Sequence, residues 1–159
     1  MNCQKKTIEI PYTVIARKEM SEELLKLEQK AIEMAQLAYA KYSNFRVGVA
    51  LQLSNGEVVS ASNQENAAYP SGLCAERTAL FYAGAKYPDA KILKLVLVAY
   101  SPKERVEVIS PCGACRQVML ETSVRQNQPY EVYLCGEKNT IVIEDNRLML
   151  PFGFDGSDL

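Results

Sequence analysis

The pattern of apolar and polar residues predicts a long helix soon after the start of the chain. Ser21 is a suitable N-cap, and acidic residues follow it in the first turn. Apolar residues then recur at helical spacing, at Leu24, Leu27, Ala31, Met34 and Ala38. We therefore expect a helix over about residues 21–40.

Shorter apolar runs predict several strands and two further helices. Residues 46–63 are typical of two strands joined at Asn55-Gly56, which is a strong hairpin signal. The pattern then predicts, in chain order, a helix at about 74–86, a buried strand at 91–100, a helix at about 113–124, and strands at 130–136 and 140–145. Residues 7–15 are also apolar and β-branched, but Pro11 limits them to an edge strand. Strands that alternate with helices predict one α/β layered domain, with a sheet between helices.

Composition and charge narrow the classes of function. The 159 residues are 48% apolar and 23% charged, which is typical of a single globular domain. The formal net charge is −1, so the chain lacks the basic excess with which proteins bind nucleic acid. No apolar run approaches the roughly eighteen residues of a membrane span, and the first residues do not resemble a signal peptide. We expect a cytoplasmic protein that binds neither membrane nor nucleic acid.

Five cysteines and the absence of histidine restrict the chemistry further. An odd number of cysteines argues against a disulfide framework. Without histidine, Ser-His-Asp and Cys-His catalysis are excluded, and a metal site must be built from sulfur and oxygen. Thiolates select zinc or an iron–sulfur cluster over magnesium or calcium.

Three of the cysteines lie at predicted helix starts. Cys112 and Cys115 form a C-x-x-C pair at one start, and Cys74 lies at another. Helix N-termini favour negative charge and lower the pKa of thiols, so three thiolates at two such ends can share one zinc ion. Three protein ligands leave a position open for water, which is typical of a catalytic zinc. We expect Cys135 to be a small buried residue and Cys3 to be a tail residue.

Charged side chains beside these cysteines suggest roles of their own. Glu76 follows Cys74 by two residues, so it can lean over the open position and carry a proton between water and a leaving group. Zinc with three thiolates has a net negative charge, and we expect Arg77 and Arg116 to offset it through hydrogen bonds to sulfur. The alternative is that both are solvated arginines on helix surfaces.

Three blocks of sequence together resemble the cytidine deaminases, which are small zinc enzymes of pyrimidine salvage. The blocks are YSNFRVGVAL, NQENAAYPSGLCAERTAL and SPCGACRQVM, in that order. The resemblance covers roughly residues 25–159. It implies a three-layer α/β/α domain, with one mixed central sheet of about five strands, over residues 21–159. Residues 1–20 are then an N-terminal extension that can add an edge strand.

The resemblance also implies an activity and a partner. The expected reaction is hydrolytic deamination of cytidine and deoxycytidine to uridine and deoxyuridine plus ammonia. It implies one Zn²⁺ per subunit and a homotetramer whose active sites are completed across subunits. Matched position by position, the zinc ligands are Cys74, Cys112 and Cys115, and the proton shuttle is Glu76.

The substrate contacts implied by the resemblance are Asn63 and Glu65 for the ribose, Phe45 for the base, and Phe154 from a neighbouring subunit. The ribose contacts also follow from residue chemistry. In an extended segment Asn63 and Glu65 point to the same side, and an amide beside a carboxylate suits vicinal hydroxyls. Because Glu65 would repel a phosphate, we expect nucleosides to be preferred over nucleotides.

Three alternatives stay open at this stage. The first is a deaminase of the same fold that acts on another cytosine-bearing small molecule, such as an antibiotic, or on a base in RNA. The second is a non-catalytic structural zinc protein, which needs four thiolate ligands and leaves Glu76 without a role. The third is a redox protein in which Cys112 and Cys115 form a reversible disulfide.

Overall fold

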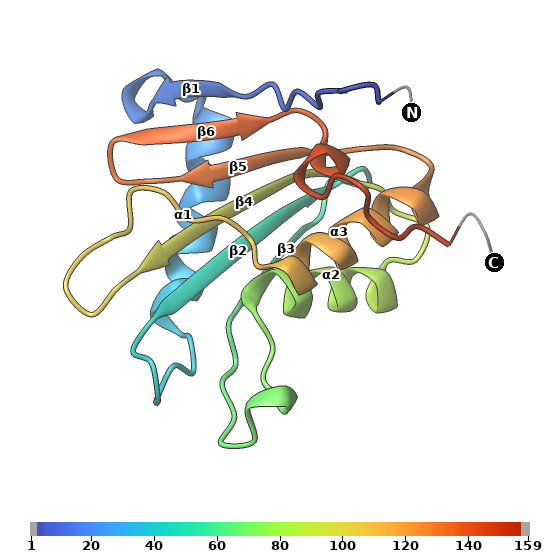
Figure 1. The fold of residues 1–159 in the computed structure, drawn as a ribbon. Coiled ribbons are helices and arrows are strands. Elements are labelled where there is room, and N and C mark those ends of the chain that lie inside the picture. The colour runs from blue at the N-terminus through green and yellow to red at the C-terminus, as the bar shows by residue number, and fades with distance from the viewer. Residues whose placement is uncertain (1–2, 157–159) are drawn as a thin grey trace.

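The computed structural model describes residues 3–156 and contains one six-stranded mixed sheet with helices on both faces (Figure 1). The strands are β1 (Thr13–Ala16), β2 (Arg46–Leu53), β3 (Val58–Ser62), β4 (Ile92–Tyr100), β5 (Glu131–Cys135) and β6 (Asn139–Ile143). The α-helices are α1 (Glu22–Gln36), α2 (Ala75–Lys86) and α3 (Gly113–Gln126). Short 3₁₀ helices are η1 (Arg17–Glu19), η2 (Tyr69–Ser71) and η3 (Asn146–Met149).

The strand order in the sheet is β1-β6-β5-β4-β2-β3. β4 and β5 run parallel, because α3 forms the crossover between them, and every other pair is antiparallel. The sheet has six strands where about five were predicted. The sixth is the edge strand β1, which begins two residues after Pro11 and pairs with β6. The predicted boundary between an extension at 1–20 and a domain at 21–159 stays a prediction, and residues 1–2 and 157–159 lie outside the described chain.

The three predicted layers are confirmed. α1 covers one face of the sheet, and α2 and α3 lie side by side on the other (Figure 1). Each face has its own apolar core. The α1 side buries Leu24, Leu27, Ala31, Val96 and Val98, and the α2–α3 side buries Val49, Leu51, Ala79, Leu97 and Met119. The strand β4 contributes to both cores, which explains its uninterrupted apolar sequence.

Helix α1 begins as predicted but ends early. The Ser21 hydroxyl accepts a hydrogen bond from the backbone N–H of Leu24, at 3.2 Å, and so caps the helix. The helix packs directly on β2 at Gly48, where an added Cβ would lie 1.9 Å from the carbonyl oxygen of Ala31. It ends at Gln36 rather than near 40. Tyr39 instead pairs with Gln64 in a short parallel bridge.

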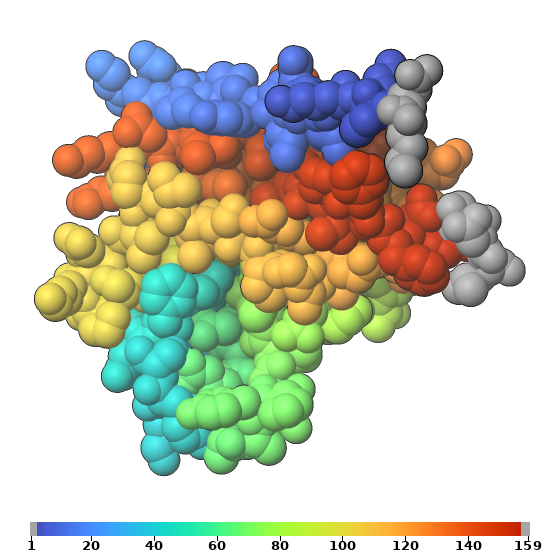
Figure 2. All heavy atoms as spheres, in the orientation of Figure 1, coloured from blue at the N-terminus to red at the C-terminus, as the bar shows by residue number. Residues whose placement is uncertain are grey.

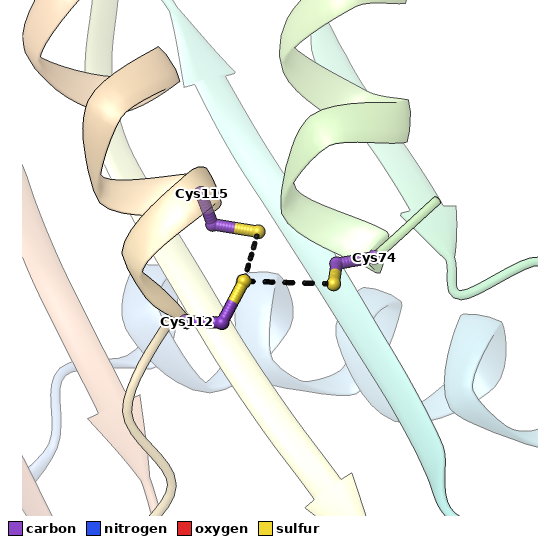
Figure 3. Close-up of side chains that lie close together, drawn as sticks. All are labelled: Cys74, Cys112 and Cys115. Atoms are coloured by element: carbon purple, nitrogen blue, oxygen red, sulfur yellow. Dashed lines mark hydrogen bonds between the residues drawn. The ribbon is translucent and has the colours of Figure 1, made fainter. Parts of the chain in front are cut away.

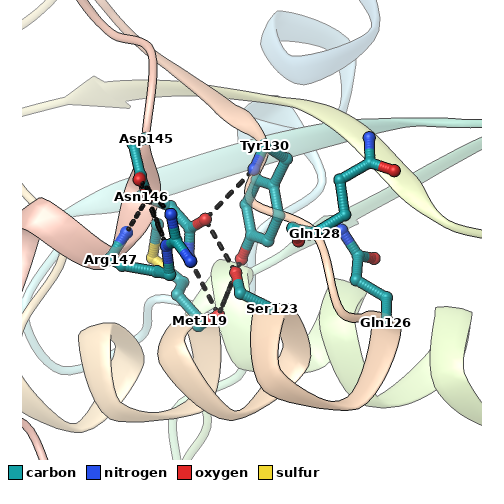
Figure 4. A network of polar contacts seen from close by, with 8 residues as sticks. All are labelled: Met119, Ser123, Gln126, Gln128, Tyr130, Asp145, Asn146 and Arg147. Atoms are coloured by element: carbon teal, nitrogen blue, oxygen red, sulfur yellow. Dashed lines mark hydrogen bonds and ion pairs between the residues drawn. The ribbon is translucent and has the colours of Figure 1, made fainter.

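A buried polar network joins the C-terminal segment to α3 (Figure 4). The Asn146 side-chain oxygen accepts from the Ser123 hydroxyl at 2.7 Å and from the Tyr130 N–H at 3.1 Å, and its amide donates to the Met119 carbonyl at 2.9 Å. Both polar atoms of the Asn146 side chain therefore have hydrogen-bond partners within the core. Within residues 3–156, no helix combines the length and apolar character needed to cross a membrane.

Candidate active site

The starts of α2 and α3 bring three cysteines to one point (Figure 3). Cys74 is the N-cap of α2 and Cys112 is the N-cap of α3, while Cys115 lies one turn into α3. Neither N-cap thiol makes a capping hydrogen bond to a backbone N–H of its own helix, and the sulfur atoms of Cys74 and Cys112 face each other across the gap. The sulfur of Cys112 lies 3.4 Å from that of Cys115 and 3.8 Å from that of Cys74, and all three ligand atoms lie within 4.8 Å of one another.

This spacing fits a tetrahedral zinc ion. Two Zn–S bonds of about 2.3 Å at a tetrahedral angle place their sulfur atoms about 3.8 Å apart. Within the described part of the chain, no further cysteine or carboxylate joins the cluster. Cys135 is buried in the core on the α1 side, as predicted, and Cys3 is exposed. The cluster therefore offers three ligands and leaves a fourth position for water or substrate.

The three thiols influence one another electrostatically. A hydrogen bond from the Cys115 thiol, with help from Arg77, lowers the pKa of Cys74 to about 5. The same contact, together with burial, raises the pKa of Cys115. The cluster thus loses one proton readily and resists losing the next, because the negative charges would lie side by side. A divalent cation at the centre removes this obstacle, since it replaces the remaining protons.

Glu76 is buried beside the cluster and is only 4% exposed. Burial raises the pKa of its carboxyl group, and the nearby charge of Cys74 acts in the same direction. The carboxyl also shares a hydrogen bond with the Cys115 thiol. A carboxyl group in such surroundings takes up and returns protons more readily near neutral pH than an exposed one does.

The two arginines predicted to offset the charge behave differently. Arg77 donates toward the Cys74 sulfur at 3.9 Å, and its buried Nε has no partner. Arg116 does not contact sulfur in the described chain. It donates to the carbonyls of Pro111 at 2.8 Å and Met149 at 3.1 Å, and its expected hydrogen bond to a zinc-bound sulfur stays a prediction. Met149 is the last residue of η3, so this bond links η3 to the first turn of α3.

A cavity of about 570 Å³ opens beside Cys74. It lies between the segment around residues 42–43 and the loop 63–73, which project together from the sheet (Figures 1 and 2). Its lining includes Asn63 and Glu65, so the structure brings both predicted ribose contacts to the same cavity as Cys74 and Arg77. Backbone hydrogen bonds between Gln64 and Leu73, at 2.8 and 2.9 Å, hold the segment extended.

Asn63 and Glu65 also hold the neighbouring loop. The Asn63 side chain accepts from the Val47 N–H at 2.7 Å and donates to the Phe45 carbonyl at 2.9 Å. The Glu65 carboxylate accepts from the Tyr42 N–H at 2.7 Å and from the N–H and hydroxyl of Ser43. The Ser43 hydroxyl and the Tyr42 N–H lower the pKa of Glu65, which keeps it ionised. Each side chain retains hydrogen-bonding capacity for a ligand.

Two tyrosines in the cavity lining were missed by sequence reasoning. Tyr42 and Tyr69 meet edge to face, with ring centroids 6.2 Å apart, and both line the cavity. They come from loops that are distant in the sequence. The available signal was an aromatic residue in each of two predicted loops that flank the ribose motif.

The two predicted phenylalanine contacts are not part of this cavity. Phe45 is half-buried, and its carbonyl accepts a hydrogen bond from Asn63, which lines the cavity, but Phe45 itself is not in the lining. The side chain of Phe154 is 62% exposed, while its carbonyl accepts a hydrogen bond from Gln117 at 2.6 Å. Its backbone is therefore anchored to α3 with the ring facing outward. Both assignments stay predictions.

Comparison with known proteins identifies the family. A family model described as the cytidine and deoxycytidylate deaminase zinc-binding region matches residues 21–131. The chain belongs to this deaminase family. The match includes both helix starts and the loop with Asn63 and Glu65. It supports one zinc site per subunit of this deaminase, in agreement with the three clustered thiols.

Whole-chain relatives agree with the family. A cytidine deaminase from Halalkalibacterium halodurans is 36% identical over 135 residues, which cover 84% of this chain and 95% of that protein. A second, from Sporosarcina psychrophila, is 38% identical over 139 residues, covering 87% and 93%. A crystal structure of cytidine deaminase from Burkholderia pseudomallei superposes with a TM-score of 0.70 at 37% identity, covering 85% of this chain and 100% of that one.

Proposed function

We propose that this deaminase hydrolyses cytidine and deoxycytidine to uridine and deoxyuridine with release of ammonia. The observation that carries the proposal is the meeting of Cys74, Cys112 and Cys115 beside the buried Glu76. Cys74 also lines a cavity together with Asn63 and Glu65. We assign the three cysteines as the zinc ligands. When bound, zinc supplies a Lewis acid that makes water nucleophilic near neutral pH.

Glu76 moves the protons in this scheme. Hydrolysis at C4 of the cytosine ring forms a C–O bond and breaks the C–N bond to the amino group. Glu76 takes a proton from the attacking water and places it on N3 of the ring. It then takes the proton of the new C4 hydroxyl and delivers it to the amine, which leaves as ammonia while the C4 carbonyl forms. Its buried position supports this role, because its raised pKa suits a group that must gain and lose a proton in each turnover.

Binding of the sugar is assigned to Asn63 and Glu65. Their remaining donor and acceptor positions suit the ribose hydroxyls, and their bonds to the loop 42–47 hold them in place before substrate binds. The ionised Glu65 opposes a phosphate in the same cavity, which favours nucleosides over nucleotides. Arg77 keeps its charge close to the Cys74 sulfur and offsets part of the negative charge of the ligands.

The proposal also covers the oligomeric state and the cellular location of the protein. We assign a homotetramer in which Phe154 reaches the site of a neighbouring subunit and Phe45 adjoins the base. The outward position of the Phe154 ring on an anchored backbone supports this assignment. We further assign a cytoplasmic location. All five cysteines are free thiols, as expected in a reducing compartment.

The test is conversion of cytidine to uridine, followed by ultraviolet absorbance, with and without a zinc chelator. We expect turnover by the zinc-loaded protein, loss of turnover after chelation, and recovery when zinc is added. A parallel incubation with a cytosine-bearing antibiotic shows whether the protein deaminates that alternative class of substrate instead of cytidine. If the zinc-loaded protein leaves cytidine unchanged, the proposed reaction is wrong.

A further inference from the structure

Glu28 on α1 is fully buried and lies between two arginines from separate parts of the chain. Its carboxylate is 2.5 Å from Nη2 of Arg105 and 2.9 Å from Nη2 of Arg17, whose Nε also donates to it at 3.0 Å. The Arg105 side chain is itself only 9% exposed. Burying the Glu28 carboxylate and the Arg105 guanidinium is costly, and apolar residues would often be at least as stable at such a site. Their presence calls for a role beyond stability.

Arg105 belongs to the segment 101–111, called the strap here, which connects β4 to α3 (Figure 1, gold). Besides Glu28, Arg105 bonds the Cys135 carbonyl at 3.1 Å. Two residues later, the Glu107 carboxylate accepts from the N–H groups of Lys138 and Asn139, at 3.0 and 2.9 Å. The strap is thus fastened to α1, to the end of β5 and to the β5–β6 turn.

The contact between the strap and this turn is close. An added Cβ at Gly136 would lie 2.0 Å from the Glu107 carbonyl oxygen, so the two backbones touch directly. The strap then ends at Pro111, whose carbonyl accepts from Arg116 at 2.8 Å. The next residue is Cys112. Its thiol is exposed and it precedes the first turn of α3, so its position depends on the backbone that leads into it.

The segment before α1 binds the same two places as the strap, which are the Glu28 carboxylate and the β5–β6 turn. Arg17, in η1, contacts Glu28 through its side chain, and its backbone N–H donates to the Lys138 carbonyl in the β5–β6 turn at 2.8 Å. This segment precedes residue 21, where the family match begins. Arg17, which lies outside the family match, therefore contacts the same carboxylate (Glu28) and the same β5–β6 turn as the strap does.

We propose that Arg105, held by the Glu28 carboxylate that Arg17 also contacts, is a positioning residue that fixes the strap and thereby holds Cys112 at the zinc site. The inference rests on the proposed zinc ligands. Without the Arg105–Glu28 bond the strap gains conformational freedom, and ordering it again to bring Cys112 to the metal costs free energy. The N-terminal segment contributes through Arg17, which takes the second oxygen of Glu28.

The first experiment compares zinc release from the full-length wild type and the Arg105→Met variant. Zinc-loaded protein is mixed with a chromogenic chelator well below its melting temperature. We expect about tenfold faster release from Arg105→Met, the scale seen when groups that support metal ligands are lost. The kcat for cytidine should fall and recover when zinc is added, with KM unchanged, and Arg105→Lys should restore part of the slow release.

Lys94→Met is the matched control. It removes another ion pair between the sheet and α1, from Lys94 to Glu23 at 2.8 Å, which does not touch the strap. Its zinc release should equal that of the wild type. Arg17→Met, at a half-exposed side chain, should act in the same direction as Arg105→Met with a smaller effect.

Specific outcomes overturn the inference. If Arg105→Met lowers the melting temperature but releases zinc at the wild-type rate, the ion pairs of Glu28 with Arg17 and Arg105 serve stability only. If that variant does not fold, the double variant Glu28→Gln/Arg105→Met removes the buried pair together, and wild-type release from it leads to the same conclusion. Zinc release is measured without cytidine, so a wild type that binds zinc but fails to deaminate cytidine contradicts the proposed function alone.

Discussion

Glu76 and Glu28 are both buried glutamates on helices, at 4% and 0% exposure, but their surroundings differ. Glu28 lies between two guanidinium groups and has ion pairs on both carboxylate oxygens. Glu76 has no ion pair in the described chain, and burial raises the pKa of its carboxyl group. A paired buried carboxylate holds its neighbours in place, whereas an unpaired one beside a metal cluster can exchange protons.

The largest expected effect is on turnover, from Glu76→Gln. Glutamine keeps the shape of the side chain but cannot carry the proton, so kcat for cytidine should fall by about 10²- to 10⁴-fold. Zinc content and melting temperature should stay close to those of the wild type. The measurements are the cytidine assay, metal analysis and thermal unfolding of the same preparation. Full activity in this variant would remove Glu76 from the mechanism.

Glu28→Gln should show the opposite pattern. The substitution leaves the nearly buried Arg105 without its counter-ion, and the free energy of unfolding should fall by about 3–5 kcal/mol. With zinc in excess, turnover per folded molecule should stay near the wild-type value, because the side chain is remote from the cavity. Denaturant unfolding of the zinc-loaded protein tests the first part. An unchanged midpoint would contradict the contrast between the two glutamates.

Glu65→Gln should have an intermediate effect that is confined to substrate binding. Loss of the charge weakens the hydrogen bonds to ribose hydroxyls, and kcat/KM for cytidine should fall about tenfold, chiefly through KM. The discrimination against CMP should also become smaller, because the carboxylate no longer repels the phosphate. Glu144→Gln, at an exposed glutamate outside the cavity lining, serves as the control. Equal kcat/KM for CMP and cytidine in the wild type would contradict this role of Glu65.

Glu23→Gln should have the smallest effect of the four. Glu23 is an exposed partner of Lys94 on the same helix as Glu28, and ion pairs in water contribute little because solvent screens them. Thermal unfolding should give a melting temperature indistinguishable from that of the wild type. A large loss of stability here would mean that the effect of Glu28→Gln does not arise from its burial.

Much of the fold could be predicted because its signals are local. The Ser21 cap, the Asn55-Gly56 hairpin and the apolar run of β4 each depend on neighbouring residues, and each is present in the structure. The end of α1 was predicted too late, because the helical pattern continues to Ala38 while Tyr39 is taken up by pairing with Gln64. Long-range pairing overrides helical periodicity at this point.

The candidate site shows the same division. The positions of Cys74 and Cys112 at helix starts follow from the sequence pattern, and the structure confirms that both are N-caps. The acceptors of Arg116 could not be predicted, because η3 reaches the first turn of α3 only after the C-terminal segment has folded back across it. The cavity tyrosines come from two loops whose proximity depends on the pairing of Tyr39 with Gln64.

By itself the sequence determined the chemistry available to this protein: three thiols at two helix starts, a glutamate two residues after one of them, and no histidine to replace them. These features depend on residue type and short spacing, which the chain carries before it folds. Only the tertiary structure decided that the three sulfur atoms lie within 4.8 Å of one another. It also decided that Glu76 is buried with no ion pair to any described residue, while Glu28 is held between two arginines. The physical reason is that burial and charge pairing depend on contacts between distant segments, which form only when the sheet and its helices pack together.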